Sequence, residues 1–366
     1  MRKRVLFIWF KKPTGILEGG GLANQRNYQM ASAVLGADNV DSYYIHAEHQ
    51  THPLWNKLRS ALLTPFNYWN GLTPGKVKEI LRIAPRYDFI FINTTVYGLL
   101  AKKLKEAGYK GTVIAHFHNV ESIYYEANLP RRMPLRRLLL KCVWHNDAYA
   151  CQYADKVICL NERDSRKLQE IYGRKADFIT PIAIADKAPR TQDAPAAQTS
   201  AKPVCLFLGS DIAANVEGIL WFVHNVLPAV SIDLRIVGKG MGKVQSQHPE
   251  LQKLEVVDSP ADLTPYFLQA DFMLLPIFSG SGMKVKTCES LMYGKNIIGT
   301  DEAFEGYAID AEQVGARCNT AQEFIDALRH YAAHPRPHHN AYSRQLYLSK
   351  YSPAATESLY RRIFDA

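Results

Sequence analysis

The residues of this chain that are best suited to chemistry lie between positions 280 and 294, where the sequence is GSGMKVKTCESLMYG. The apolar run 272–276 before them predicts a buried strand, so Gly280 and Gly282 fall in the loop that leads from this strand into a helix. Backbone amides at such a helix start can approach an anion closely, because glycine has no side chain that keeps the anion away. The stretch therefore predicts an anion-binding loop.

Two lysines and one acid follow this loop. Lys284 and Lys286 place positive charge in the first helical turn, where a cation opposes the helix dipole and is favoured only when an anion lies nearby. Glu289 follows about one turn later, where its carboxylate can accept hydrogen bonds from the vicinal hydroxyls of a ribose. These residues indicate a site for a diphosphate and a ribose; the alternative is a solvated helix start with one exposed acid.

The same segment resembles the donor site of nucleotide-sugar glycosyltransferases of family 4. The resemblance covers residues 276–294, continues through 296–300 and ends at the Glu-Gly pair 305–306. Many members of that family carry two glutamates separated by seven residues, of which the first contacts the donor sugar and the second the ribose. Glu289 matches the second glutamate, and Ser281 stands in place of the first. This places the chain nearer a branch in which a Gly-x-Gly-x-Lys-x-Lys run replaces the first acid.

Resemblance to this family implies an α/β protein of the GT-B fold, in which two doubly wound Rossmann-like domains face each other across a cleft. It implies transfer of a hexosyl unit from a nucleotide diphosphate sugar to an acceptor hydroxyl, with retention of the anomeric configuration. It also implies that neither a cofactor nor a metal is required, because lysines and backbone amides stabilise the leaving diphosphate. Lys284 and Lys286 are the catalytic lysines in this interpretation, and the departing phosphate takes the acceptor proton.

The length and composition predict a soluble protein of two domains. A chain of 366 residues exceeds the usual size of one hydrophobic core, and 47% of its residues are hydrophobic. No apolar run approaches the ~18 residues that a membrane span needs, and Lys11, Lys12 and Pro13 interrupt the opening run before a signal-peptide core forms. The six cysteines form no Cys-x-x-Cys pair, which indicates reduced, mostly buried thiols in a cytoplasm.

The net charge of +9 is unevenly distributed along the chain. Residues 1–185 contain 27 Lys and Arg against 15 Asp and Glu, a net +12, whereas residues 186–366 contain 17 against 20, a net −3. The sequence has no nucleic-acid motif and no aromatic-basic repeat, so nucleic acid is not the expected partner. An anionic membrane or a lipid-linked phosphate acceptor fits the basic first half better.

Two stretches in that half are candidates for membrane contact. The acid-free run 130–141, PRRMPLRRLLLK, combines five cations with leucines, as an amphipathic helix on an anionic membrane does. Its alternative is a helix whose leucines face the core and whose arginines face water. The second candidate is an apolar cluster that suits contact with a membrane, stacking against a sugar ring or packing inside the protein. It consists of Trp55, Leu62, Leu63, Phe66, Tyr68 and Trp69.

Strand-like runs alternate with helical patterns in both halves, which predicts parallel sheets wound with helices. The expected strands are 5–10, 42–45, 89–92, 113–116 and 157–160 in the first half, and 204–208, 234–237, 254–257, 272–275 and 296–298 in the second. The expected domains are residues 1–185, which bind the acceptor, and residues 204–345, which bind the nucleotide sugar. Residues 186–203 form a linker between them, and residues 346–366 contain a helix that crosses back to the first domain in the fold that the chain resembles.

A glycine triplet at positions 19–21 follows the first strand and precedes the helical run 22–35. Amides at this helix start can bind a phosphate, although flexible turns use the same residues. In family 4 a glycine-rich loop in this place approaches the donor phosphates. The resemblance therefore assigns Gly20 and Gly21 to donor binding.

The polar run 116–121, His-Phe-His-Asn-Val-Glu, follows another expected strand. A lone histidine is usually structural, but family members with a His-Asn-x-Glu run in this loop place the histidine beside the donor sugar, which assigns a catalytic role to His118. His116 more simply ends the strand. A metal held by His116, His118 and Glu121 is a further alternative.

The second domain begins with a strand that ends at Gly209 and Ser210, and Asn215 follows as an expected helix cap. This segment resembles the Gly-Ser and Asn-Val-x-Gly pattern of family 4, which assigns all three residues to donor binding. Many family members hold the diphosphate with Arg and Lys in this loop, where the present chain has neither. Lys239, in a Gly-Lys-Gly turn, is a candidate for a further positive charge that binds the diphosphate. Alternatively, it is a solvated residue of a surface turn.

The sequence thus favours a retaining hexosyltransferase whose acceptor is a lipid-linked saccharide of a bacterial surface polysaccharide. It acts in the cytoplasm or at the inner face of the cell membrane. Two other classes stay open: a hydrolysing nucleotide-sugar 2-epimerase, which shares the fold, and a catalytically silent GT-B partner protein. The nucleotide base, the sugar and the acceptor are not determined by these motifs.

Overall fold

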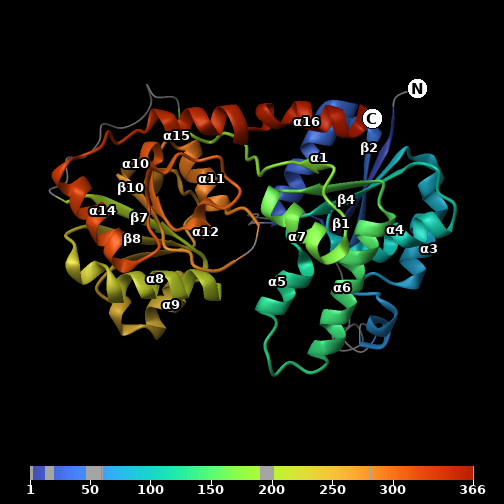
Figure 1. Cartoon of the computed structure of the whole chain (residues 1–366), viewed down its shortest axis with the longest axis horizontal. Helices are drawn as coiled ribbons and strands as arrows, with labels where there is room; N and C mark the ends of the chain where they lie inside the picture. Colours follow the sequence, from blue (N-terminus) through green and yellow to red (C-terminus); the bar gives the residue numbers. More distant parts are fainter. Residues whose placement is uncertain are drawn as a thin grey trace. The chain divides into compact units, whose positions relative to one another are not determined.

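The computed structural model describes residues 3–12, 20–46, 59, 61–189, 202–280 and 282–365. The chain divides into two compact units, one formed by Met1–Ile182 together with Thr356–Ala366 and the other by Ala183–Ala355 (Figure 1). Each unit contains one six-stranded sheet, and all strand pairs in both sheets are parallel. The expected α/β class with two doubly wound sheets is confirmed.

In the first unit the sheet has the strand order β2-β1-β3-β4-β5-β6. The order reverses between β1 and β3, so the loops after these two strands leave to opposite sides. The strands are β1 (Val5–Lys11), β2 (Val40–His46), β3 (Phe89–Ile92), β4 (Thr112–Phe117), β5 (Lys156–Cys159) and β6 (Phe178–Ile179). The helices include α1 (Gly20–Leu35), α3 (Pro74–Ile83), α4 (Gly98–Glu106), α5 (Glu121–Asn128), α6 (Arg136–Tyr153), α7 (Glu162–Tyr172) and, from the end of the chain, α16 (Pro353–Asp365).

Both faces of this sheet are buried, which explains why its strands are apolar throughout instead of alternating. Along β1, Leu6 and Ile8 belong to a core cluster on one face, and Val5, Phe7 and Trp9 belong to a cluster on the other. The second cluster also contains apolar residues of α1 and α16: Met30, Ala31, Tyr360, Ile363 and Phe364. The final helix therefore completes the core of the first unit, where it lies beside α1 (Figure 1).

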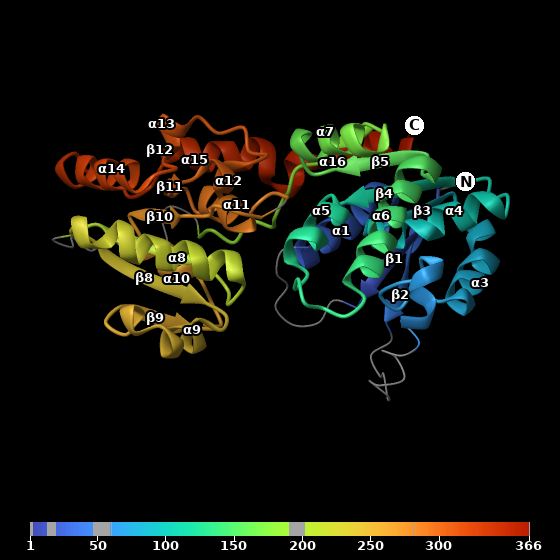
Figure 2. The ribbon, with the colours of Figure 1, turned by 60° about the horizontal axis from the view of Figure 1, so that its bottom comes forward.

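The second unit has the strand order β12-β11-β10-β7-β8-β9 and is flanked by its own helices (Figure 2). Its strands are β7 (Val204–Leu208), β8 (Asp233–Gly238), β9 (Glu255–Asp258), β10 (Phe272–Leu275), β11 (Asn296–Gly299) and β12 (Gly315–Arg317). Its helices are α8 (Ala213–Asn225), α9 (Met241–Gln247), α10 (Thr264–Gln269), α11 (Val285–Met292), α12 (Asp301–Phe304), α13 (Ala311–Val314), α14 (Ala321–Ala333) and α15 (Ala341–Leu346). The order reverses between β7 and β10, which is where open α/β sheets bind ligands.

The ten expected strands all form, with ends that differ by at most a few residues. Two short strands, β6 and β12, were not predicted, because segments of two and three residues give no detectable periodicity. The glycines Gly20 and Gly21 form the first turn of α1 instead of a loop before it. The run 130–141 is helical only from Arg136 onward, so the expectation of one amphipathic stretch is wrong for residues 130–135.

All six cysteines are buried and free, as expected. Within the described ranges, no helix is both long enough and apolar enough to cross a bilayer.

One helix-to-strand contact in the second unit leaves no room for a side chain. A Cβ atom on Gly218, inside α8, would lie 2.0 Å from the carbonyl oxygen of Pro276, just beyond β10. Only glycine allows the helix to approach the end of the strand this closely. Gly218 thus fixes the distance between α8 and the segment after β10.

We predict that Gly218→Ala destabilises the protein by about 1–3 kcal/mol, because the added methyl group forces α8 away from Pro276. In Gly75→Ala, on the exposed start of α3, a Cβ meets only the Thr73 hydroxyl oxygen, at 4.0 Å. This control should be neutral or stabilised, because alanine favours the helix by up to about 1 kcal/mol. Urea unfolding of both variants measures the difference, and equal stabilities would contradict the close contact.

Candidate functional site

The predicted donor residues of the second unit gather at the carboxyl ends of β7 and β10. These neighbouring strands pair directly, with Phe272 opposite Cys205 and Met273 opposite Leu206. The loop after β7 contains Gly209 and leads into α8, while the loop after β10 leads into α11. The starts of two helices therefore meet at the point where the strand order reverses.

A hydrogen bond joins the two loops at this point. The Lys286 ammonium donates to the Asn215 side-chain oxygen across 2.7 Å, and the Asn215 side-chain nitrogen donates to the Ser210 carbonyl oxygen across 3.1 Å. Asn215 is not the helix cap that the sequence predicted, because α8 begins at Ala213 and Asn215 lies within its first turn. Its side chain positions Lys286 instead.

The ammonium group of Lys286 is partly buried beneath these loops. It lies 5.2 Å from the centroid of the Phe207 ring, a distance that suits a cation–π contact. Burial lowers the pKa of Lys286 to about 7, although the carboxylate of Glu289 partly opposes this shift. The described residues include no carboxylate within ion-pair distance of this ammonium. An anionic ligand is the partner that would favour its charged form.

Glu289 lies one turn further along α11 and is also partly buried. Burial raises the pKa of Glu289 to about 7, against the opposing effects of Lys187 and Lys286. Lys187 was not predicted as a site residue, since it lies in the expected linker. The pair Lys286 and Glu289 therefore changes protonation near neutral pH.

The other predicted lysine is already paired. Lys284, the residue before α11, forms an ion pair of 2.6 Å with Glu302 and donates to the Gly282 carbonyl oxygen across 3.0 Å. Gly282 has a φ of 64°, in the left-handed region that favours glycine. Ser281 lies outside the described residues. A diphosphate would have to compete with Glu302 for Lys284, which makes Lys286 the better placed cation.

Lys239 lies on the exposed turn after β8, between Gly238 and Gly240. The backbone amide of Asp211 donates to its carbonyl oxygen across 3.1 Å, so this turn adjoins the loop after β7. A Cβ atom on Gly238 would lie 1.9 Å from the Gly209 carbonyl oxygen. The close packing of these two turns brings Lys239 to the edge of the candidate site.

In the first unit, His118 follows β4 and is buried, with 7% of its surface exposed. Its Nε2 atom lies 2.6 Å from the carbonyl oxygen of Asn93 and 2.5 Å from the side-chain oxygen of Asn24. Asn93 directly follows β3, and Asn24 lies in the second turn of α1, one turn after Gly20 and Gly21. The structure thus brings the predicted glycines and histidine to the same edge of the sheet.

The alternative of a metal bound by the first unit finds little support. The rings of His116 and His118 lie 4.5 Å apart, as a shared strand face predicts. Burial and the nearby Asp147 raise the pKa of Glu121 to about 8, so this carboxyl group is protonated and a weak metal ligand at neutral pH. No group of three metal-binding side chains occurs among the residues that the structure describes.

Comparison with known proteins agrees with this architecture. Residues 202–334 match the family model described as glycosyl transferases group 1. Sucrose-phosphate synthase from Thermosynechococcus elongatus superimposes with a TM-score of 0.73 at 16% identity, over 100% of both chains. Anabaena HepE in complex with UDP superimposes with a TM-score of 0.69 at 12% identity, over 99% of both chains. The chain has the GT-B fold.

A further structure similar to this chain is the lipopolysaccharide outer core galactosyltransferase WaaB in its apo form, with a TM-score of 0.66 at 14% identity over 99% of both chains. No curated protein matches the chain in sequence. The similarity to solved structures therefore covers both units, while the family match covers most of the second unit.

Sequence reasoning missed several residues that position the predicted ones. Glu302 pairs with Lys284 from a distance of 18 residues, and Phe207 lies beneath Lys286 from inside a strand. Nothing in the local sequence indicates either contact. Asn93 could have been found, because it directly follows an expected strand at the edge where parallel sheets bind ligands.

We predict that binding of a nucleoside diphosphate takes up a proton at Lys286. Because the pKa of Lys286 is about 7 without ligand and rises beside an anion, the affinity should fall as the pH rises from about 7 to about 9, by at most about tenfold per pH unit. Calorimetry in buffers of different ionisation enthalpy measures this uptake. Lys286→Ala should remove it and lower turnover by on the order of tenfold to a thousandfold.

The matched control is Lys284→Ala, which removes a cation whose charge Glu302 already neutralises. It should leave the proton uptake in place. Equal proton uptake by Lys286→Ala and the parent protein would contradict the assignment of Lys286 to the diphosphate.

Proposed function

We propose that this protein is a glycosyltransferase that moves a hexosyl unit from a nucleotide diphosphate sugar to an acceptor hydroxyl, with retention of configuration. The acceptor in this proposal is a lipid-linked saccharide of a bacterial surface polysaccharide, and the protein works in the cytoplasm at the inner face of the membrane. The reaction uses the nucleotide sugar as co-substrate and needs no cofactor or metal.

The observation that carries the proposal is the partly buried Lys286 ammonium at the reversal of strand order in the second unit. Amides of two helix starts and this cation converge where a diphosphate would lie, and Glu289 follows at the distance of one helical turn. Similar structures support the nature of the ligand, because Anabaena HepE has been crystallised with UDP, with UDP and glucose, and with UDP-glucose.

The chemistry needs stabilisation of negative charge on the leaving diphosphate. In a partly buried site, a preorganised cation and amides do this more effectively than water, because they are already oriented before the bond breaks. His118 in the first unit supplies a neutral ring beside the donor sugar in this proposal. The departing phosphate accepts the proton of the acceptor hydroxyl.

One experiment tests the proposal against the 2-epimerase and the silent partner. The full chain is incubated with UDP-, GDP-, ADP- and dTDP-linked sugars, and heat stabilisation is measured before the products are analysed. A transferase gives sugar-dependent stabilisation and the nucleoside diphosphate with a glycosylated acceptor. A free epimerised sugar indicates the epimerase, and the absence of stabilisation by every nucleotide sugar contradicts the proposed donor site.

The basic surface of the first unit supports a membrane contact as part of this proposal. Leu135 and Met133, in the segment before α6, expose 57% and 37% of their surfaces, and Arg131, Arg132 and Arg137 are exposed beside them. Leu135 has a φ of 61°, a strained conformation that turns the chain into α6 with its side chain outward. Exposed apolar and cationic side chains together suit an anionic lipid surface.

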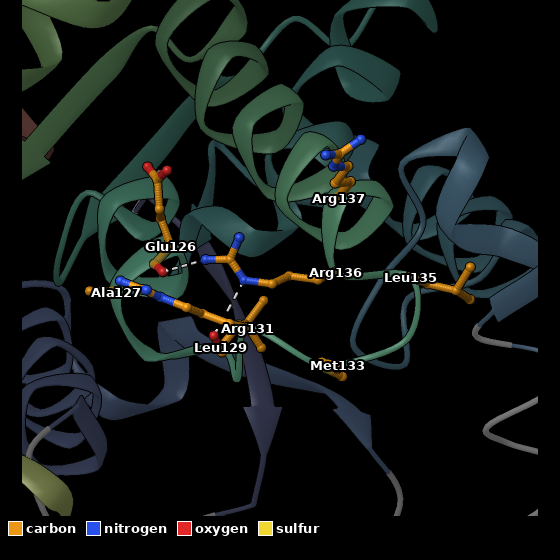
Figure 3. A pocket seen from close by; sticks show the side chains of 8 residues that line it. All are labelled: Glu126, Ala127, Leu129, Arg131, Met133, Leu135, Arg136 and Arg137. Atoms are coloured by element: carbon orange, nitrogen blue, oxygen red, sulfur yellow. Dashed lines mark hydrogen bonds between the residues drawn. The ribbon is translucent and has the colours of Figure 1, made fainter.

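An open depression of about 820 Å³ lies beneath this segment (Figure 3). The sequence predicted that Arg136 contacts the membrane, but the structure gives this side chain other partners. Its guanidinium donates to the carbonyl oxygens of Glu126 and Leu129, across 2.8 and 3.3 Å, and so ends α5 (Figure 3). Arg136 is thus a structural residue, which leaves the other cations for the membrane.

The apolar cluster predicted further upstream adjoins α6 as well. Leu62 and Phe66 expose 65% and 68% of their surfaces, and the next residue, Asn67, is bound to α6. The Asn67 side-chain oxygen lies 2.9 Å from His145 Nδ1, and Asn146 donates to the Asn67 carbonyl oxygen across 3.1 Å. Trp55 lies outside the described residues.

We predict that the protein sediments with vesicles containing phosphatidylglycerol at low salt and is released as salt rises, because ions screen charges beyond about 8 Å at physiological ionic strength. Reversal of Arg131, Arg132, Arg137 and Lys141 to Glu should abolish binding, since each cation contributes about 1 kcal/mol near the surface. The control reverses the exposed Lys110, Arg166, Lys167 and Lys175. An equal loss of vesicle binding in both variants, or equal sedimentation with neutral vesicles, would contradict the proposed membrane-binding surface.

A further inference from the structure

The open depression beside α6 is lined by three arginines and only one acid. Its volume of about 820 Å³ lies within the range of about 300–1,000 Å³ that is usual for small-molecule sites. The end of α5, the start of α6 and the segment between them form it (Figure 3). All of its lining residues lie between positions 126 and 137, so the whole depression belongs to the first unit.

The protein does not neutralise the positive charge in this depression. Among the residues that the structure describes, no carboxylate lies within ion-pair distance of Arg131, Arg136 or Arg137. Glu126 is the only acid in the lining, and its carboxylate points away from the Arg136 guanidinium (Figure 3). Three arginines against one glutamate give the lining a formal net charge of +2. Such a charge attracts an anionic ligand.

Arg136 holds one of these charges in a fixed position. Its Nη2 and Nε atoms donate to the carbonyl oxygens of Glu126 and Leu129. Both acceptors are neutral, so the guanidinium keeps its full charge, and its Nη1 atom has no partner among the described residues. A side chain that is ordered before the ligand arrives loses little conformational entropy on binding. Arg136 is therefore preorganised to donate to an anion.

The first turn of α6 adds to the positive potential of the depression. Leu135, at the N-cap, provides no side-chain hydrogen bond, and the turn contains no acid. Arg136 and Arg137 occupy this turn instead, where a cation opposes the helix dipole. An anion in the depression would offset both unfavourable effects, since it lies beside the same guanidinium groups.

The depression also has an apolar part. Met133 and Leu135 line it and are exposed, although burial of apolar side chains is favourable. A small soluble anion would leave these two side chains in water, whereas the hydrocarbon chain of a lipid would cover them. The lining therefore suits an amphiphilic ligand in which an anionic group is joined directly to hydrocarbon.

The formal charge of the lining distinguishes between two kinds of lipid anion. The phosphodiester of a phospholipid carries about one negative charge, whereas a diphosphate that joins a lipid to a saccharide carries about two, one on each phosphate. A diphosphate thus matches the charge of +2. It also offers enough oxygens for several guanidinium groups, each of which can donate two parallel hydrogen bonds.

We propose that this depression binds the diphosphate group of the lipid-linked acceptor, with Arg131, Arg136 and Arg137 donating hydrogen bonds to its oxygens. Met133 and Leu135 contact the first carbons of the lipid chain. The identity of the ligand as an acceptor rests on the proposed function. Exposed cations hold the protein on an anionic membrane in this arrangement, and the depression selects one lipid from that membrane.

Binding of a soluble prenyl diphosphate tests the site without a membrane, a donor or a transfer reaction. The full chain is titrated by calorimetry with farnesyl diphosphate, below the concentration at which this compound forms micelles. We expect one molecule to bind per chain. Arg131→Gln and Arg137→Gln should each weaken binding by about tenfold or more, because each removes charge-assisted hydrogen bonds. Arg136 is left unchanged, because its hydrogen bonds also hold the end of α5.

The matched control is Arg132→Gln, because Arg132 is an exposed cation of the same segment but does not line the depression. It should change the affinity for farnesyl diphosphate by less than about twofold. Lys286→Ala, in the second unit, should also bind farnesyl diphosphate as the parent protein does, whereas a loss would place this ligand at the nucleotide site and overturn the proposal. Equal losses for Arg131→Gln and Arg132→Gln would indicate a diffuse basic surface and would likewise overturn it.

Three further ligands separate the contributions of the diphosphate and the chain. Farnesol lacks the diphosphate, inorganic diphosphate lacks the chain, and dihexanoyl phosphatidylglycerol carries a phosphodiester instead. Each should bind at least about tenfold more weakly than farnesyl diphosphate. Tighter binding of phosphatidylglycerol would assign the depression to a membrane phospholipid, and equal binding of inorganic diphosphate would show that no chain is recognised. Either result contradicts the proposal.

Failure of this site and failure of the proposed function give different results. If nucleotide sugars support transfer but farnesyl diphosphate does not bind, the protein is a transferase and the depression is not its acceptor site. If farnesyl diphosphate binds through Arg131 and Arg137 but no nucleotide sugar supports transfer, the depression is confirmed as a site for a lipid diphosphate, while the proposed function fails.

Discussion

The second unit is arranged around a partly buried ammonium group that has no carboxylate beside it among the described residues. Removing a charge from water is unfavourable, and the Lys286 ammonium recovers only part of this cost from one amide oxygen and one aromatic face. The amide comes from α8, which must therefore approach the end of β10. Gly218 allows this approach because it has no side chain that would collide with Pro276. A backbone contact and a charge separated by 68 residues are thus parts of the same arrangement.

In the first unit, a hydrogen-bond network orients two neutral side chains, Asn93 and His118. Arg26 and Tyr360 both donate hydrogen bonds to the side-chain oxygen of Asn27, which fixes the orientation of its amide. Asn27 then donates to the side-chain oxygen of Asn93, whose carbonyl oxygen accepts from His118. Among the described residues, the Lys286 ammonium of the second unit has no carboxylate partner, and Asn93 Nδ2 and His118 Nδ1 of the first unit are buried without a hydrogen-bond partner.

The sequence predicted the parts of the fold that depend on local pattern. Apolar runs such as 204–208 and 272–275 became strands with unchanged ends, because both faces of a parallel sheet are buried and the runs have no polar interruption. The lysines and the histidine were predicted as site residues from residue type and position after a strand. The pairing of Lys284 with Glu302 and the role of Asn215 were not predictable, since both depend on contacts between distant segments. Arg136 illustrates the same limit, because only the path of the backbone shows that this arginine ends a helix.

The chain passes between its two units twice, once at residues 182–183 and once within α16, whose residues from Thr356 onward belong to the first unit. Tyr360, Ile363 and Phe364 fill part of the first unit's core from this last helix. A single cut at the first crossing therefore does not yield two intact domains: the amino-terminal fragment would lose the helix that completes its core and orients Asn27. Dissection of this protein into separately expressed halves requires residues 356–365 to be fused back onto the first fragment, and a tag or deletion at the carboxyl terminus acts on the amino-terminal unit.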